Sequence, residues 1–175
     1  MTRQPAVLSA TGLFTPPYSI SNNELVAAFN QYVHQYNQTH ATEIASGSLE
    51  ALAESSSEFI VKASGIHSRF VMNKDGIVNP DIMRPQFAKR SDETLSLQAE
   101  MGVAAAQQAL DTAGVEASAI DMVLVANSNM QRAYPAMAVE IQAALGCSGF
   151  AYDMNVACSS AIFALQAAAD AVANG

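Results

Sequence analysis

Cys158 is the side chain of this sequence best placed to do covalent chemistry. It lies between an apolar segment, residues 150–155, and an alanine-rich segment, residues 159–173. These two patterns predict a strand followed by a helix. A thiol at such a turn faces unpaired backbone N–H groups and the positive end of the helix dipole, and both favour the nucleophilic thiolate. The same N–H groups could stabilise an oxyanion formed when the sulfur attacks a carbonyl.

The alternative for Cys158 is a buried cysteine that begins a core helix. A cysteine nucleophile also needs a partner base, and the three histidines all lie early in the chain, at His34, His40 and His67. The other cysteine, Cys147, follows a predicted helix end and is the weaker candidate. Because histidines and cysteines form no cluster, the sequence predicts no metal site. Two cysteines are too few for a disulfide framework.

The elements that would position Cys158 alternate between strand and helix patterns. Residues 6–14 and 121–126 are apolar runs typical of buried strands. Ser21 and Glu24 form a capping box, which predicts the start of a helix. Such alternation predicts an α/β fold in which helices cover a mixed sheet.

Further helices are expected where alanine, leucine and methionine recur, over residues 50–64, 91–113 and 135–145. Long loops or insertions are expected near residues 35–48 and 73–90, where polar residues and prolines interrupt the periodicity.

Composition excludes several classes of protein. Half of the residues are apolar and the formal net charge is −8, which argues against a nucleic-acid-binding protein because such proteins present a basic face. No apolar run approaches the roughly 20 residues of a membrane span, and the first residues lack a signal-peptide pattern. We therefore expect a cytoplasmic protein that binds neither nucleic acid nor membrane.

Residues 153–160 resemble the nucleophile segment of β-ketoacyl-(acyl-carrier-protein) synthase III, the thiolase-fold condensing enzyme that initiates fatty acid synthesis. Further segments are similar to the family in the same order and at similar spacing: residues 12–25, 59–66, 123–126 and 134–146. The resemblance covers most of the chain. It implies that residues 1–175 form the N-terminal half of a thiolase-like fold, that the chain is truncated, and that the C-terminal half is absent.

The resemblance also implies a mechanism. Cys158 would accept an acyl group from acyl-CoA, and malonyl-acyl carrier protein would then lose carbon dioxide and attack the resulting thioester. No cofactor is implied, because acyl-CoA and the malonyl carrier protein are substrates. The implied partners are acyl carrier protein, acyl-CoA and a second copy of the chain in a homodimer. Because the family uses a histidine and an asparagine from its second half, this chain alone is expected to be inactive.

Substrate-binding residues follow from the same resemblance. Phe59 and Ala63 match positions where the family often carries a Trp and an Arg that hold the CoA adenine; the alternative is that Phe59 belongs to the core. Tyr134 matches an aromatic residue that crosses the dimer interface and closes the acyl pocket; the alternative is a tyrosine packed within its own subunit. Asn127 and Ser128 would line that pocket or interface. The apparent insertions favour medium-chain acyl-CoA as the primer.

Two other functions compete with condensation. One is a related thiolase-fold activity, such as that of 3-hydroxy-3-methylglutaryl-CoA synthase or a non-decarboxylating acyltransferase. The other is an inactive fragment that only dimerises.

Overall fold

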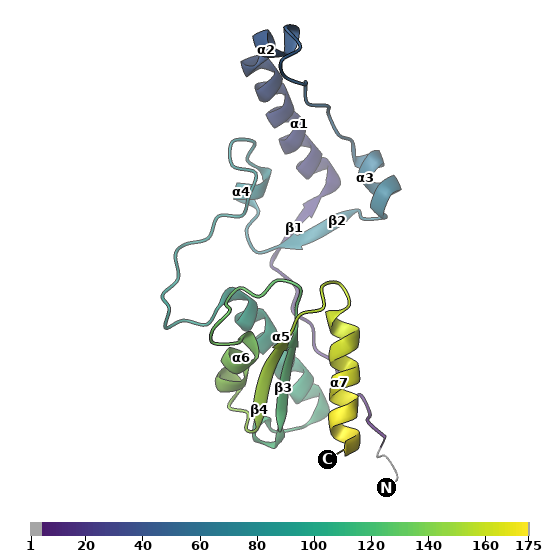
Figure 1. The fold of residues 1–175 in the computed structure, drawn as a ribbon, viewed down its shortest axis with the longest axis vertical. Coiled ribbons are helices and arrows are strands. Elements are labelled where there is room, and N and C mark those ends of the chain that lie inside the picture. The colour runs from purple at the N-terminus through teal and green to yellow at the C-terminus, as the bar shows by residue number, and fades with distance from the viewer. Residues whose placement is uncertain (1–4, 175) are drawn as a thin grey trace. The chain divides into compact units, whose positions relative to one another are not determined.

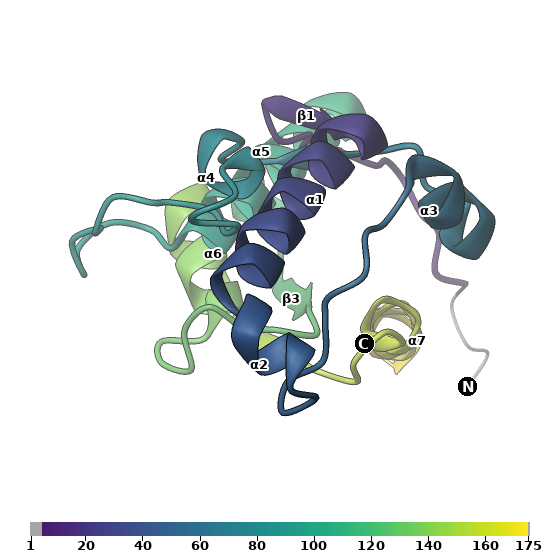
Figure 2. The same cartoon turned by 90° about the horizontal axis from the view of Figure 1, so that it is seen from above.

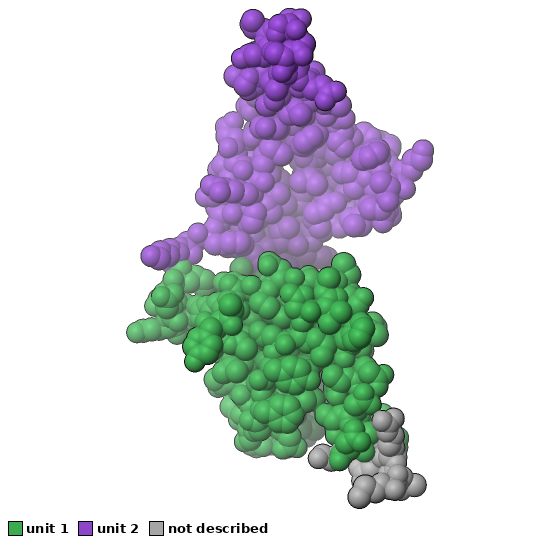
Figure 3. Space-filling view, viewed as in Figure 1, with its two compact units in different colours: residues 1–14, 90–175 green, residues 15–89 purple. Residues whose placement is uncertain are grey.

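The computed structural model describes residues 5–174, which form two compact units (Figure 3). Unit 1 combines the chain up to Phe14 with the chain from Arg90 onward, and unit 2 runs from Thr15 to Lys89. The α/β class is confirmed, but the expected mixed sheet is divided into two separate two-stranded sheets. Within residues 5–174 no helix has the length and apolar character needed to cross a bilayer.

Unit 2 is built on the antiparallel pair β1 (Tyr18–Ser21) and β2 (Ser68–Val71), whose register pairs Tyr18 with Val71. Helix α1 (Asn22–Thr39) follows β1 without a loop. The predicted capping box is confirmed: the Ser21 hydroxyl accepts from the Glu24 N–H at 3.3 Å, and a Glu24 carboxylate oxygen accepts from the Ser21 N–H at 3.0 Å.

The segment from residue 35 to residue 64 differs from the prediction in two ways. Its first part is more helical than expected, and its second part is less helical. Residues 35–48, expected to be a loop, continue α1 to Thr39 and then form α2 (Ala41–Ala45). The helix expected over residues 50–64 begins only at Ser57, as α3 (Ser57–Ser64), capped by the Ser56 hydroxyl. The beginning of that prediction, up to Ser56, is therefore wrong.

Asparagines of α1 explain the extended segment before α3. Asn37 both donates to the Leu52 carbonyl oxygen and accepts from the Leu52 N–H, each at 2.9 Å. Asn30 binds the backbone of Ser55 in the same two-way manner, at 3.0 and 2.9 Å. A side-chain amide that satisfies both backbone groups competes directly with helical hydrogen bonds.

Residues 73–90 are mostly irregular, as expected, with one short helix, α4 (Asp75–Val78). Lys74 fastens this segment to the start of α1, because its ammonium forms an ion pair with Glu24 and donates to the Ser19 carbonyl oxygen at 3.0 Å. Hydrogen bonds from Lys74 and then from Ser21 lower the pKa of Glu24 from 4.5 to about 2.

Unit 1 contains the parallel pair β3 (Met122–Ala126) and β4 (Phe150–Met154), in register from Met122 opposite Phe150. Its helices are α5 (Leu97–Ala113), α6 (Met137–Leu145) and α7 (Ser160–Asn174), with a short 3₁₀ turn at Ala117–Ala119.

Helices cover both sides of the parallel pair. Helix α6 packs on α5 and on both strands, and α6 and α7 lie on opposite sides of β3 (Figure 1 and Figure 2). The buried cluster Ala99, Met137 and Ile141 joins α5 to α6. Val123 and Val125 of β3 pack against it, as expected for a strand covered by helices.

Two predictions for unit 1 are wrong. The helix expected from residue 91 begins at Leu97, because the buried Ser96 hydroxyl accepts from the Ala99 N–H at 3.2 Å and so caps it. Residues 6–14 form no strand. The backbone of Gly12 instead approaches α5 so closely that a Cβ there would lie 1.9 Å from the Ala105 carbonyl oxygen. The next amide, that of Leu13, donates to the Gln108 side chain of α5 at 2.6 Å.

Candidate active site

Cys158 lies between the end of β4 and the start of α7, and its side chain is exposed. The alternative of a buried core cysteine is therefore wrong. Because β3 and β4 are parallel, Cys158 sits at the carboxyl edge of the pair, where open α/β sheets bind their ligands. The predicted strand–cysteine–helix arrangement is confirmed.

The turn that carries Cys158 has an unusual backbone. Ala157, the residue before the cysteine, has a φ of +47°. Residues other than glycine rarely adopt this left-handed backbone conformation. Asn155 supports it by accepting from the Ala157 N–H at 3.1 Å. Ser160 supports it too: its hydroxyl accepts from the Val156 N–H at 2.8 Å and donates to the Ala157 carbonyl oxygen at 2.7 Å.

Fewer backbone donors are free at this turn than the sequence suggests. The Ser159 N–H donates to the Val156 carbonyl oxygen at 3.0 Å, and the Ser160 N–H donates to that of Ala157 at 3.2 Å. No group of residues 5–174 accepts a hydrogen bond from the Cys158 N–H. That amide could therefore donate to an oxyanion formed when the Cys158 sulfur attacks a carbonyl.

The loop after β3 lies beside the cysteine turn. The Asn127 N–H donates to the Met154 carbonyl oxygen at 3.1 Å, and the Asn155 amide donates to the Ser128 carbonyl oxygen at 3.3 Å. The structure therefore brings two of the predicted substrate-binding residues, Asn127 and Ser128, next to the segment that leads into Cys158.

Polar anchors hold the rest of this loop against α5 and α6. Gln98 and Gln131 exchange hydrogen bonds between backbone and side chain, at 3.1 and 2.8 Å. The nearly buried Glu140 carboxylate accepts from Arg132 at 2.9 Å. On β4, the Asp153 carboxylate accepts from the first two amides of α6 at 2.8 Å each, which places a negative charge at the positive end of that helix.

Tyr134 lies in the same loop but extends away from the protein. Its side chain is 92% exposed, which contradicts the alternative of a tyrosine packed within its own subunit.

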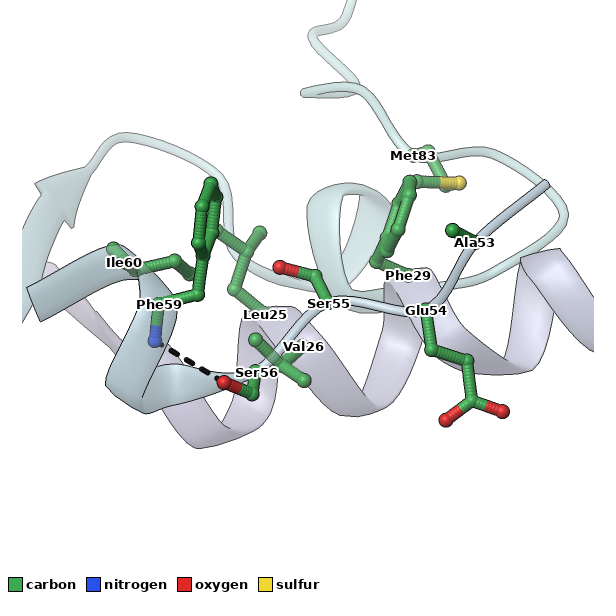
Figure 4. A pocket seen from close by; sticks show the side chains of 10 residues that line it. All are labelled: Leu25, Val26, Phe29, Ala53, Glu54, Ser55, Ser56, Phe59, Ile60 and Met83. Carbon is green, nitrogen blue, oxygen red and sulfur yellow. Dashed lines mark hydrogen bonds between the residues drawn. The ribbon is translucent and has the colours of Figure 1, made fainter. Parts of the chain in front are cut away.

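Phe59 belongs to unit 2, whereas Cys158, Asn127, Ser128 and Tyr134 belong to unit 1. It is 65% exposed, so the alternative of a core residue is wrong. Its ring borders a cavity of about 670 Å³ between α1, α3 and the segment before α3. Phe59 and Ile60 lie at one end of this cavity, and Phe29 and Met83 lie at the other (Figure 4).

The three histidines of the sequence lie in the other unit from Cys158. His34, His40 and His67 all belong to unit 2, and His34 pairs with Glu54 at 3.0 Å. Among residues 5–174, histidines, cysteines and carboxylates form no group of three that could hold a metal ion.

Sequence reasoning assigned no role to Asn155 or Ser160, although both contact the cysteine turn. Asn155 could have been recognised as a strand-end asparagine, because such side chains often bind the backbone two residues on. A serine two residues after the cysteine carries no comparable signal, since its partners depend on the conformation of Ala157.

Comparisons with known proteins agree with this arrangement. The β-ketodecanoyl-(acyl-carrier-protein) synthase of Pseudomonas aeruginosa is 62% identical over 148 residues, which cover 85% of this chain and 42% of that protein. The β-ketoacyl-(acyl-carrier-protein) synthase III of Bartonella tribocorum is 40% identical over 118 residues, 67% of this chain and 30% of that protein. No family model matches the chain.

Solved structures show the same fold. The priming β-ketosynthase of the R1128 polyketide pathway superposes with a TM-score of 0.68 at 26% identity, over 99% of this chain and 39% of that one. The 3-oxoacyl-(acyl carrier protein) synthase III of Pseudomonas aeruginosa gives a TM-score of 0.65 at 20% identity, over 98% of this chain and 39% of that one. The chain therefore spans less than half the length of the proteins it matches, and it belongs to the β-ketoacyl-(acyl-carrier-protein) synthase III family.

Proposed function

We propose that Cys158 accepts an acyl group from acyl-CoA, and that a complete enzyme of this kind condenses the group with malonyl-acyl carrier protein. The observation that carries the proposal is the exposed Cys158 thiol at the carboxyl edge of a parallel strand pair, ahead of a helix N-terminus. Support comes from the relative at 62% identity, which is named a β-ketodecanoyl-(acyl-carrier-protein) synthase.

In the first step the Cys158 sulfur attacks the thioester carbonyl of acyl-CoA. The carbonyl oxygen becomes an oxyanion that can accept a hydrogen bond from the Cys158 N–H. The bond to the CoA sulfur then breaks, CoA leaves as a thiol with the proton lost by Cys158, and the acyl group remains on Cys158. One thioester replaces another, so the step needs neither an oxidant nor a cofactor.

In the second step malonyl-acyl carrier protein loses carbon dioxide, and its carbanion attacks the Cys158 thioester. The new carbon–carbon bond forms as the Cys158 sulfur leaves, which regenerates the thiolate and releases a β-ketoacyl carrier protein. The family resemblance assigns the assisting histidine and asparagine to the second half of the fold. This chain accordingly supplies the nucleophile and the first half of the reaction.

The primer we propose is a medium-chain acyl-CoA. Condensation adds two carbons, so a β-ketodecanoyl product, as in the name of the relative, requires an eight-carbon acyl group. We assign Asn127, Ser128 and Tyr134 to the acyl pocket and Phe59 to CoA binding. We further propose a cytoplasmic homodimer in which the exposed Tyr134 side chain contacts the second copy.

The test is mass spectrometry of the chain after incubation with octanoyl-CoA. We expect one octanoyl group on the peptide that contains Cys158, retained in Cys147→Ala and lost in Cys158→Ala. A chain that iodoacetamide alkylates at Cys158, but that octanoyl-CoA, acetyl-CoA and longer acyl-CoA never acylate, would contradict the proposal and favour the inactive, dimerising fragment. Release of a β-ketoacyl product would contradict the expectation that this chain alone does not condense.

A further inference from the structure

Ser160 is the first residue of α7 and follows Cys158 by two positions. It is 3% exposed, and its hydroxyl makes two short hydrogen bonds to the turn that carries the cysteine. We infer that Ser160 is a positioning residue that fixes this turn so that the Cys158 sulfur and the Cys158 N–H act on the same carbonyl group. The inference rests on the proposed role of Cys158 as the acyl-accepting nucleophile.

The direction of the hydrogen bonds separates this role from ordinary helix capping. A capping side chain accepts from an amide two or three positions further into the helix. The Ser160 hydroxyl instead accepts from the Val156 N–H, four residues before it, at 2.8 Å. It donates to the Ala157 carbonyl oxygen at 2.7 Å. Both partners precede Cys158, so the hydroxyl holds the turn.

Ala157 is the residue of the turn whose backbone conformation must be stabilised by its surroundings. Its φ of +47° is unfavourable for a residue with a Cβ, so the conformation persists only where surrounding contacts impose it. Ser160 binds the carbonyl of Ala157 and the amide of the residue before it. Asn155 binds the Ala157 N–H at 3.1 Å, from the other side of the peptide. These two side chains therefore restrain both dihedral angles of Ala157.

A hydroxyl suits the position because one oxygen must both accept and donate. Replacing Ser160 by alanine would leave the Val156 N–H and one lone pair of the Ala157 carbonyl without a protein partner. The backbone would then relax toward an ordinary φ, and the direction of the following residue, Cys158, would change. The Cys158 N–H belongs to the peptide that joins Ala157 to Cys158, so a change in the Ala157 backbone would turn both this N–H and the cysteine side chain relative to a bound carbonyl group.

Two reactions of the Cys158 sulfur, acylation and alkylation, can distinguish a positioning role of Ser160 from a role in stability alone. Acylation passes through an oxyanion that the Cys158 N–H can stabilise, whereas alkylation by iodoacetamide is a displacement that forms no oxyanion. Loss of the Ser160 hydroxyl should therefore slow acylation more than alkylation. Unfolding, by contrast, would also accelerate the alkylation of the half-buried Cys147.

The experiment measures, by mass spectrometry, the rates of Cys158 octanoylation by octanoyl-CoA and of Cys158 and Cys147 alkylation by iodoacetamide. In Ser160→Ala we expect acylation to fall by about three- to tenfold, the effect of losing the one hydrogen bond from the Cys158 N–H to the oxyanion. Alkylation of both cysteines should stay within about twofold of the wild type. Ser160→Thr keeps the hydroxyl and should retain acylation. The matched control is Ser159→Ala, because the Ser159 side chain makes no hydrogen bond within residues 5–174.

Acylation unchanged in Ser160→Ala, or equally reduced in Ser160→Thr while Cys147 stays protected, would overturn the positioning role and leave the proposed function intact. A wild-type chain that is alkylated but never acylated would overturn the proposed function, and this inference with it. If Ser160→Ala does not fold, Ser160→Val, which has the shape of Ser160→Thr without the hydroxyl, is compared with Ser160→Thr, and the rates of that pair decide in the same way.

Discussion

The two cysteines of unit 1 lie at opposite ends of helices. Cys147 follows α6, whose left-handed C-cap is Gly146, and the Cys147 N–H donates back to the Gln142 carbonyl oxygen at 3.0 Å. Cys158 precedes α7 and is exposed, with an amide that binds no other group of residues 5–174. The negative end of one helix dipole thus faces Cys147, and the positive end of another faces Cys158.

Burial separates the two thiols further. Cys147 is half-buried at an apolar cavity of about 480 Å³ that Leu110, Ile141 and Leu145 help to line. Burial raises the pKa of the Cys147 thiol above its ordinary value of 9.0, because the charged thiolate loses solvation. The fold therefore gives two identical side chains opposite environments, and we expect their reactivity to differ accordingly.

The largest expected effect is the loss of acyl transfer when Cys158 is replaced. Cys158→Ala should give no octanoyl adduct, whereas Cys147→Ala should be acylated at the wild-type rate, because only the first change removes the nucleophile. Intact-mass measurements over a time course check both variants. An octanoyl adduct that persists in Cys158→Ala would show that Cys158 is not the acyl acceptor.

A difference in alkylation rate is the next largest effect. At pH 7 we expect iodoacetamide to modify Cys158 at least about tenfold faster than Cys147, because the half-buried Cys147 thiol has a raised pKa and is harder to reach. The raised pKa of Cys147 means that its rate should still be increasing as the pH passes 9.0. Peptide mass spectrometry between pH 6 and pH 10 tests this. Equal rates at pH 7, or a Cys147 rate that levels off below pH 9, would contradict it.

Local signals made this contrast partly predictable from sequence. The strand–cysteine–helix order places Cys158, and Ser21 with Glu24 marks the start of α1, because each pattern depends on residues within a few positions. The failures involve distant partners. Leu52 is extended because Asn37 occupies its backbone groups, and Ser160 acts through the left-handed Ala157. Neither relation can be inferred from spacing alone.

A smaller effect should follow from loosening the wall beside Cys147. Ile141→Val removes one methylene from the cluster that joins α5 to α6 and should destabilise unit 1 by about 0.5–1.5 kcal/mol. If Cys147 reacts through opening of unit 1, its alkylation should accelerate by about two- to tenfold, while native-state alkylation of Cys158 should change little. Denaturant titration measures the free energy of unfolding, and iodoacetamide labelling measures the ratio of the Cys147 rate to the Cys158 rate. An unchanged Cys147 rate despite lower stability would show that the thiol is already reached in the folded protein.

The smallest expected effect comes from Glu24, in unit 2. A change there tests whether the difference in alkylation rate between Cys158 and Cys147 depends on unit 1 alone. The Glu24 pKa is lowered from 4.5 to about 2, so its contribution to stability is complete above pH 4.5 and is lost as the pH falls toward 2. Glu24→Gln should therefore lower stability slightly at pH 7, with a gap from the wild type that narrows at pH 3. Glu50→Gln, at an exposed position outside the helices and strands, is the surface control. Denaturant titrations at both pH values measure the gap, and alkylation at pH 7 should give the wild-type ratio of Cys158 to Cys147. A changed ratio would mean that the environments of the two thiols depend on unit 2 as well.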